Sequence, residues 1–198
     1  MQKVSHMPAP NPAAMEFLLT RRSRPAKTLT GPAPDRAALT PLLTAAARSP
    51  DHGKLEPFRF IVLEKPALAR LADLAADRGA DLGKATEDIA KGRSIYDQGH
   101  LAVAVIEVQK PSEKIPAVEQ TYSAGAACLA LLNAALASGW GANWLSGWAS
   151  HDREFCQQGL GLEPHERVAG LIFLGTETSA PPERPRPDLH AITSWISE

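Results

Sequence analysis

The sequence predicts one α+β domain, in which helices flank a central mixed sheet and the chain ends in an extended arm. Three observations support this fold class. Segments with helical spacing and segments with strand composition are interspersed along the 198 residues, with no repeat. Two runs, 101–108 and 168–174, are almost entirely apolar, which is typical of strands buried on both faces. No linker composition divides the chain, so residues 1–198 are expected to share one core.

The first expected helix begins at Asn11, a favoured N-cap residue, and continues with the proline that helices accept at their first position. Apolar residues then recur at helical spacing through Leu19. Residues 1–10 show neither pattern and lack the apolar core of a signal peptide, so we expect them to be disordered. A Gly- and Pro-rich turn over 30–34 separates this helix from the next element.

The second helix is expected to begin at the N-cap Asp35 and to run to about Arg48, with a kink or a later start at Pro41. A strand follows over 58–63, where β-branched and aromatic residues are concentrated, and helical spacing returns over 67–81. The remaining elements are expected, in order, as a mobile loop or short helix over 82–99, the buried strand 101–108, a long helix over 116–138, a glycine- and tryptophan-rich strand and turn over 140–148, a short helix from Asp152, the buried strand 168–174 and the arm 180–198.

Composition and motifs exclude several classes of protein. The formal net charge of −1, without a basic stripe, argues against a nucleic-acid-binding surface. The charge-free segment 123–142 contains many small residues and predicts a buried helix or a subunit interface rather than a membrane span. Cys128 and Cys156 do not form a metal or redox motif, and we expect reduced cysteines in a cytoplasmic protein. The histidines show no HExxH or close pair, so no metal site is expected.

Nucleotide and hydrolase motifs are also absent from the sequence. No GxxxxGK[ST] segment occurs, and Gly139-x-Gly141 lacks the third glycine of a dinucleotide fingerprint. Ser146 lacks the leading glycine of a nucleophile elbow.

Three segments concentrate residues that could bind a ligand. Arg21-Arg22-Ser23 ends the first helix, where two guanidinium groups and a hydroxyl suit a phosphate but also simply complement the helix dipole. The loop 48–58 contains many charged side chains just before a strand, and it could be either a binding loop or a solvated turn. Segment 139–148 offers close backbone approach and three tryptophan surfaces, which also serve ordinary packing.

The order and spacing of these segments resemble the nitroreductase-like FMN flavoproteins, and most closely their small bacterial NAD(P)H nitroreductase branch. The resemblance extends from about Ala13 to Thr176. The segments that carry it are Arg21-Arg22-Ser23, Arg48-x-Pro50-Asp51-His52 with Glu56-Pro57-Phe58-Arg59-Phe60, Gly139-Trp140-Gly141-Ala142-Asn143-Trp144-Leu145-Ser146-Gly147 and the closing strand Gly170-Leu171-Ile172-Phe173-Leu174-Gly175-Thr176.

The resemblance implies a three-layer fold and an intertwined homodimer, with FMN at the interface and the C-terminal arm reaching across to the partner. Arg21 and Ser23 would hold the phosphate end, and the backbone amide of Ser146 or Gly147 would face flavin N5. The complete set of cofactor-binding residues that the resemblance implies is Arg21, Arg22, Ser23, Arg48, His52, Trp144, Leu145, Ser146, Gly147, Arg184 and Arg186.

The implied activity is that of an FMN-dependent NAD(P)H oxidoreductase. NADPH or NADH would deliver a hydride to the flavin and leave, and a nitroaromatic, quinone or similar electron-poor acceptor would take its place. The cofactor carries this chemistry, so no catalytic side chain is expected. Arg48 is the candidate for tuning the redox potential, with Lys54 second.

Two alternatives stay open: a specialised flavin chemistry on the same scaffold, such as dehalogenation or flavin breakdown, and a non-enzymatic flavin-binding or sensing dimer. The chain also departs from the family pattern at Lys54, Glu56 and Phe58, where many relatives carry an amide, a glutamine and a tryptophan, and at Pro25, where relatives often carry a cation. These departures leave the redox potential and the preferred acceptor open.

Overall fold

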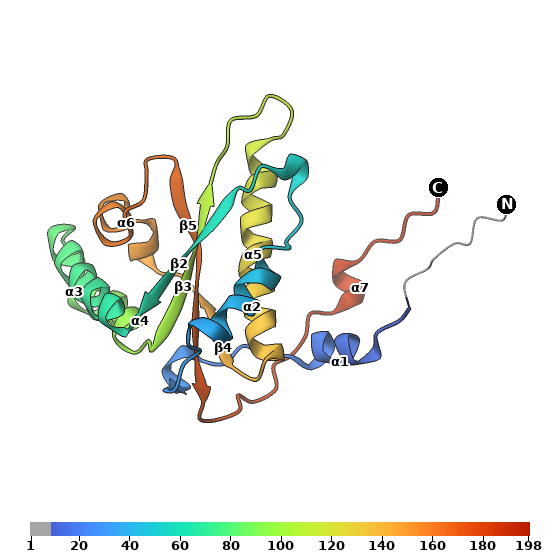
Figure 1. Cartoon of the computed structure of the whole chain (residues 1–198), viewed down its shortest axis with the longest axis horizontal. Coiled ribbons are helices and arrows are strands. Elements are labelled where there is room, and N and C mark those ends of the chain that lie inside the picture. The colour runs from blue at the N-terminus through green and yellow to red at the C-terminus, as the bar shows by residue number, and fades with distance from the viewer. Residues whose placement is uncertain (1–8) are drawn as a thin grey trace.

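The structure, a computed structural model, describes residues 9–198. One β-sheet separates two layers of helices, with α2 and α5 on one face and α3, α4 and α6 on the other (Figure 1). The helices of these layers are α2 (Arg36–Ala46), α5 (Ala117–Ala137), α3 (Lys65–Asp81), α4 (Thr86–Asp97) and α6 (Arg153–Leu160). The expected α+β class and three-layer arrangement are therefore confirmed.

The sheet has β5 at its centre, paired with β1, β3 and β4, while β2 pairs with the other side of β3. Its strands are β1 (Leu29–Thr30), β2 (Phe58–Glu64), β3 (Leu101–Val108), β4 (Gly141–Leu145) and β5 (Glu166–Glu177). The sequence predicts a mixed sheet, but every strand pair within residues 9–198 is antiparallel. The reason lies in the connections: α3 and α4 run out and back, so β3 starts with Leu101 opposite Glu64, the last residue of β2. A single crossover helix would have produced a parallel pair.

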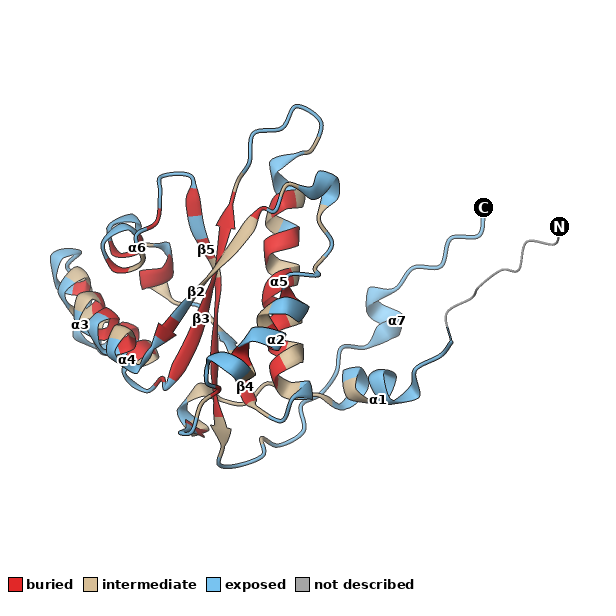
Figure 2. Cartoon of the chain, viewed as in Figure 1, coloured by how far each residue is buried: buried red, intermediate tan, exposed pale blue. Residues whose placement is uncertain are grey.

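Strand β3 fills the centre of the molecule, since all eight of its residues are buried. Successive side chains point to opposite faces, so Ala102, Ala104 and Ile106 pack with one helical layer and Val103 and Val105 pack with the other. Strand β5 alternates in the same way. The nearly unbroken apolar runs of the sequence thus reflect burial on both faces, visible as the red centre of Figure 2.

Three predicted helix starts are confirmed by their capping hydrogen bonds. The side chains of Asn11, Asp35 and Asp152 each accept a hydrogen bond from a backbone N–H in the first turn of α1, α2 and α6. Helix α2 continues through Pro41 and ends at Ala46, so neither the later start nor the extension to Arg48 is found. Pro41 lies on the exposed side of α2, where water can satisfy the carbonyl that proline leaves free.

The segment predicted as a mobile loop or short helix, 82–99, contains the 12-residue helix α4. The apolar pattern of α4 is weak because a glycine occupies one of its buried positions. Gly92 lies against the Trp148 indole, and a Cβ there would fall 2.5 Å from Nε1. Trp148 Nε1 also donates to the Asp88 carbonyl at 3.2 Å. The helix is therefore held by a tryptophan from elsewhere in the chain, which its own sequence does not reveal.

Two helical segments extend away from the layered body on the same side of the molecule (Figure 1). Helix α1 (Pro12–Thr20) has no buried residue, and neither has the short α7 (Leu189–Ile192) within the arm. Most of their large apolar side chains are exposed, and Trp195, which follows α7 in the arm, is 92% exposed. Of the segment predicted to be disordered, residues 1–8 lie outside the described residues, and Ala9 and Pro10 are exposed coil.

At one end of the sheet, Arg59 on β2 forms a salt bridge with Glu166 at the start of β5. Nε and Nη2 of Arg59 donate to the two carboxylate oxygens at 2.7 and 2.8 Å. These hydrogen bonds from Arg59 lower the pKa of Glu166 to about 2, from an ordinary value of 4.5. Because the folded-state pKa is depressed, the pair stabilises the fold fully above about pH 4.5, and this contribution is lost as the pH falls toward 2.

We therefore expect Arg59→Met to lower the free energy of unfolding by about 2 kcal/mol at pH 7, because the carboxylate of Glu166 is left buried without its partner. The difference from the wild type should narrow below about pH 4.5, where Glu166 becomes protonated. Urea unfolding at pH 7 and pH 3.5 measures both values. Arg93→Met is the control, since Arg93 pairs with Asp73 and Asp97 at the surface and should change stability by less than about 0.5 kcal/mol. Equal losses in the two variants would contradict the assignment.

Candidate functional site

Six of the eleven residues that the resemblance assigns to cofactor binding line one cavity of about 450 Å³. It lies where the segment after α1, strand β4 and the C-terminal arm meet. The lining residues are Arg21, Arg22, Ser23, Pro25, Asn143, Trp144, Pro181, Arg184 and Arg186. Two pairs of arginines more than 150 positions apart in the sequence, Arg21 with Arg22 and Arg184 with Arg186, thus place four guanidinium groups around one cavity. Neither pair alone would indicate a binding site.

Arg21 forms the inner part of this cavity. It caps α1 through its backbone N–H, which donates to the Phe17 carbonyl at 2.8 Å, and its Nη2 donates to Ser23 Oγ at 3.0 Å. Its Nε is buried and has no hydrogen-bond partner within residues 9–198. Burial lowers the pKa of Arg21, and the positive charges of Arg186 and Arg22 lower it further. A buried donor surrounded by like charges favours an anion in this space.

Glu183, in the arm, pairs with arginines of this cavity, and one oxygen of its carboxylate is close to several donors. Glu183 Oε1 lies 3.4 Å from Arg22 Nη1, 3.3 Å from Arg186 Nη2 and 2.9 Å from the backbone N of Arg184. Arg22 Nη1 also donates to the Pro182 carbonyl, which holds the arm against the segment after α1. The donors around Glu183 have the convergent arrangement that a phosphate oxygen would use.

Strand β4 forms the wall opposite the arginines. The backbone N of Arg24 donates to the Ala142 carbonyl at 2.8 Å, and Asn143 Nδ2 donates to the Arg24 carbonyl at 2.7 Å. The Trp144 indole lies over Gly170 of β5, where a Cβ would fall 2.1 Å from the indole Nε1. The glycine therefore leaves room for the tryptophan against the sheet, and Trp144 remains 37% exposed and lines the cavity.

Leu145, Ser146 and Gly147 continue β4 beyond this cavity and do not line it. Leu145 packs against the core on the α3 side of the sheet. Gly147 is extended and close to α4, since a Cβ there would lie 2.5 Å from Ile95 Cδ1. Ser146 is exposed, and its Oγ lies 3.0 Å from His151 Nε2. The segment expected to follow one edge of the flavin is thus continuous in space with the arginine cavity.

Arg48 and His52 lie elsewhere, on the side of the sheet covered by α2 and α5. Arg48 lines a cavity of about 290 Å³ between these helices, with Pro50, Leu129 and Asn133 among its walls. His52 Nδ1 lies 2.6 Å from Glu119 Oε2 of α5. Within one chain the structure therefore does not bring these two residues together with Arg21.

The unusual loop residues after His52 have a conformational role. Lys54 and Glu56 both adopt positive φ, 56° and 50°, and Asp51 accepts hydrogen bonds from the backbone N of Leu55 and of Glu56 at 3.1 and 2.7 Å. The turn between α2 and β2 is thus fixed by Asp51, and the departures from the family pattern at Lys54 and Glu56 lie on a tight turn.

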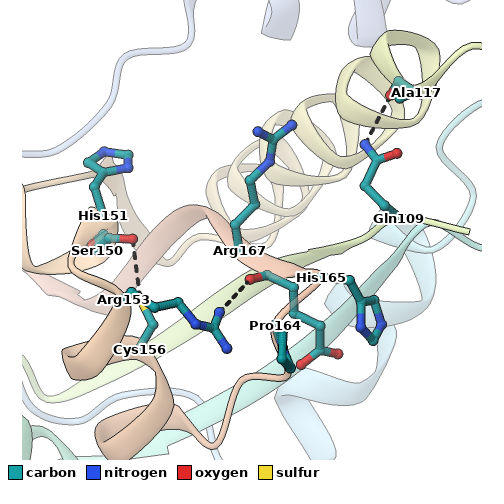
Figure 3. Close-up of a pocket in the computed structure, with 10 residues that line it drawn as sticks. Gln109, Ala117, Ser150, His151, Arg153, Cys156, Pro164, His165 and Arg167 are labelled. Carbon is teal, nitrogen blue, oxygen red and sulfur yellow. Dashed lines mark hydrogen bonds between the residues drawn. The ribbon is translucent and has the colours of Figure 1, made fainter.

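A second large cavity, of about 590 Å³, was not anticipated from the sequence (Figure 3). It lies between the start of β5, the end of β3 and the turn before α6. Its lining residues are Gln109, Ala117, Ser150, His151, Arg153, Cys156, Pro164, His165, Glu166 and Arg167. No single segment signals this cavity, because its walls come from several separate elements.

The donor groups of the arginine cavity match a phosphate-bearing ligand. Within residues 9–198 no cluster of three or more His, Cys, Asp or Glu side chains could hold a metal ion. In the same part of the chain, none of the helices combines the length and the apolarity needed to cross a membrane. Cys128 and Cys156 are free and buried, and burial raises the pKa of their thiols to about 12 and 11. Neither cysteine is therefore suited to nucleophilic chemistry.

Comparisons with known proteins agree with this fold. Residues 18–176 match the sequence profile described as "Nitroreductase family". A Haemophilus influenzae protein named "Putative NAD(P)H nitroreductase" is 36% identical over 167 residues, covering 82% of this chain and 88% of its own length. "Putative NAD(P)H nitroreductase YdjA" of Escherichia coli K12 is 32% identical over 163 residues, covering 82% and 87%.

Solved structures show the same architecture. A nitroreductase-like family protein from Bacillus cereus has a TM-score of 0.76 at 22% identity, covering 96% of this chain and 98% of its own. A Desulfovibrio desulfuricans protein, described as "a putative nitroreductase in complex with fmn", has a TM-score of 0.72 at 21% identity and covers 96% of this chain and 100% of its own. Fold and sequence together define an oxidoreductase. The chain belongs to the nitroreductase family.

Proposed function

We propose that this oxidoreductase binds FMN and uses NADPH or NADH to reduce a nitroaromatic, quinone or similar electron-poor acceptor. When bound, FMN would accept a hydride from the nicotinamide and pass it to an acceptor that enters after the nicotinamide leaves. The observation that supports this most strongly is the cavity of four arginines with the buried, unpartnered Nε of Arg21. The FMN complex of the Desulfovibrio relative supports the same cofactor.

The chain's own residues fit the two ends of such a cofactor. Arg21 and Ser23 would bind the phosphate, and Arg184 and Arg186 would close over it from the arm in place of the Glu183 carboxylate. From this cavity the chain runs along β4 through Trp144 and Leu145 and continues beyond the strand to Ser146 and Gly147. Their backbone would follow one edge of the flavin, with the N–H of Ser146 or Gly147 toward N5.

We further propose that the working unit is a homodimer. On α5 the side chains of Val118, Tyr122 and Leu129 are exposed and recur at helical spacing, and Leu129 borders the cavity of Arg48. The arm adds further exposed apolar residues, including Trp195. A second copy covering these surfaces would bury them, and would bring its own Arg48 and His52 toward the site that they cannot reach within one chain.

The alternatives make different predictions for the purified protein. A specialised flavin chemistry would require a further co-substrate, and a sensing dimer would bind FMN without accepting hydride. Absorbance between 350 and 500 nm, followed by chromatography of the heat-released cofactor, tests the first step. A flavin band whose released chromophore is FMN supports the proposal. A protein that remains colourless after incubation with FMN and does not bind it would overturn it.

Arg48 gives a test of the dimeric site. If the partner's arginine lies by the N1–C2=O edge, where reduction places negative charge, Arg48→Gln should lower the midpoint potential while FMN occupancy changes little. We expect a shift of about 30 mV, equivalent to about 1.4 kcal/mol for a two-electron couple. Anaerobic reductive titration measures the shift, with Arg36→Gln, an exposed residue of α2, as the control. An unchanged potential would remove Arg48 from this role and leave Lys54 as the next candidate.

A further inference from the structure

Ser146 and His151 form a hydrogen-bonded pair just beyond the end of β4. The serine Oγ and the histidine Nε2 are 3.0 Å apart, and both residues are exposed. By contrast, Ser150 in the same turn is only 3% exposed. The Ser146–His151 pair is therefore open to a ligand at the position where β4 leaves the sheet.

The turn that joins the pair is rigid. A 3₁₀ helix, Trp148–His151, follows Gly147, and the backbone N of Ser150 donates to the Gly147 carbonyl at 3.0 Å. Ala149 is buried, and Trp148 is fixed against the glycine of α4. This packing, rather than the side chains of the pair, determines their separation, so each can be replaced without loss of the turn.

The ring of His151 also reaches the 590 Å³ cavity, whose far side carries Arg167 and Gln109 (Figure 3). Solvent in this cavity can return a proton to the imidazole. The charged or titratable groups that share the cavity with His151 are Arg153, Cys156, His165, Glu166 and Arg167. Two of these groups form salt bridges with residues outside the cavity. Arg59 donates to the carboxylate of Glu166, and Arg167 donates to the carboxylate of Glu107 through Nε and Nη2.

We propose that Ser146 donates the proton that the reduced acceptor requires and that His151 resupplies it, which rests on the proposed placement of Ser146 beside the flavin. Reduction of an acceptor by hydride is incomplete without a proton: a quinone, one hydride and one proton give a hydroquinone. A nitro group, one hydride and one proton give a nitroso group and one molecule of water.

The transfer is balanced within the pair. The Ser146 O–H bond breaks as a new O–H bond forms on the acceptor oxygen. The Nε2–H bond of protonated His151 then breaks, and its proton restores the serine hydroxyl. His151 acts through Ser146 and is thus a positioning residue that also supplies the proton, while Ser146 touches the acceptor.

The two half-reactions separate this role from cofactor binding. In anaerobic stopped-flow experiments with the FMN-loaded protein, the flavin of Ser146→Ala and His151→Gln should still be reduced by the nicotinamide that reduces the wild type, because the proposed contact of residue 146 with the flavin is made by its backbone N–H. Reoxidation by a quinone should be about 100-fold slower, the range expected for loss of a general acid. Reoxidation by ferricyanide, which takes electrons without protons, should be unchanged. His165→Gln, which alters another histidine of the same cavity, is the control and should reoxidise normally.

A flavin-free measurement tests the pair itself. NMR titration of the histidine ring nitrogens should show the His151 signal displaced in Ser146→Ala, with the His165 signal unchanged. Quinone reoxidation at the wild-type rate in both variants would overturn the proposal while leaving the proposed function intact. Equal slowing with quinone and ferricyanide would also overturn it, because a proton-transfer role does not affect ferricyanide. Failure of the wild type itself to bind FMN, or to react with both NADPH and NADH, would instead contradict the proposed function.

Discussion

Arg21→Ala is expected to weaken FMN binding by about 1.5–3 kcal/mol, a rise in Kd of roughly 10- to 150-fold. The variant loses a hydrogen bond to a charged group and the buried Nε that has no partner within the described residues. Arg22, Arg184 and Arg186 remain in the cavity, so binding should be weakened rather than abolished. Fluorescence titration of the flavin-free protein measures the affinity, and circular dichroism verifies the fold.

Two further variants sharpen this prediction. Glu183→Gln removes the negative charge that the donors of Arg22, Arg184 and Arg186 surround, and should therefore tighten FMN binding. Arg36→Ala removes an exposed arginine of α2 and should leave the affinity unchanged. If Arg21→Ala retained wild-type affinity in a normally folded protein, the phosphate site would lie elsewhere.

Leu129→Asp is expected to convert the proposed homodimer to monomers at micromolar concentration. Leu129 is 46% exposed on the uncovered stripe of α5, and a second copy would bury it. Each copy would then bury an unpaired carboxylate at a cost of about 3 kcal/mol, and two-fold symmetry doubles this cost. A total of about 6 kcal/mol raises the dissociation constant by roughly four powers of ten. Sedimentation equilibrium measures the change.

Leu82→Asp is a matched control for this variant. Leu82 is 47% exposed, nearly the same as Leu129, but it lies at the end of α3 on the opposite layer. It should leave the dimer intact. A wild-type protein that sediments as a monomer with FMN bound, or equal dissociation in the two variants, would contradict the proposed interface.

Local sequence signals predicted those elements whose structure depends on their own residues. The side chains that cap α1, α2 and α6 and the alternating burial of β3 follow directly from residue type and period. Helix α4 was uncertain because a tryptophan from the β4–α6 connection stabilises it. The sheet directions depended on whether one helix or two joined β2 and β3, which hydrophobic period alone does not determine.

The sequence predicted those residues of the candidate site that can be recognised within a single segment, but not the contacts between distant segments. Arg21, Ser23 and Trp144 were singled out as residues, and the structure places them around one cavity with the arm's arginines. The shared oxygen of Glu183 was missed, because its three donors come from segments about 160 residues apart. Arg48 and His52 lie apart from this cavity within one chain, so their contribution depends on a second copy that residue spacing does not place.

The central claim is that the protein carries FMN as a hydride-transferring centre. Anaerobic mixing of the FMN-loaded protein with NADPH, and separately with NADH, tests it directly, with absorbance near 450 nm followed in time. We expect at least one nicotinamide to bleach the flavin band within seconds, and a quinone or nitroaromatic compound to restore it on subsequent addition. A flavin band that persists with both nicotinamides would contradict the oxidoreductase mechanism and favour the flavin-sensing dimer.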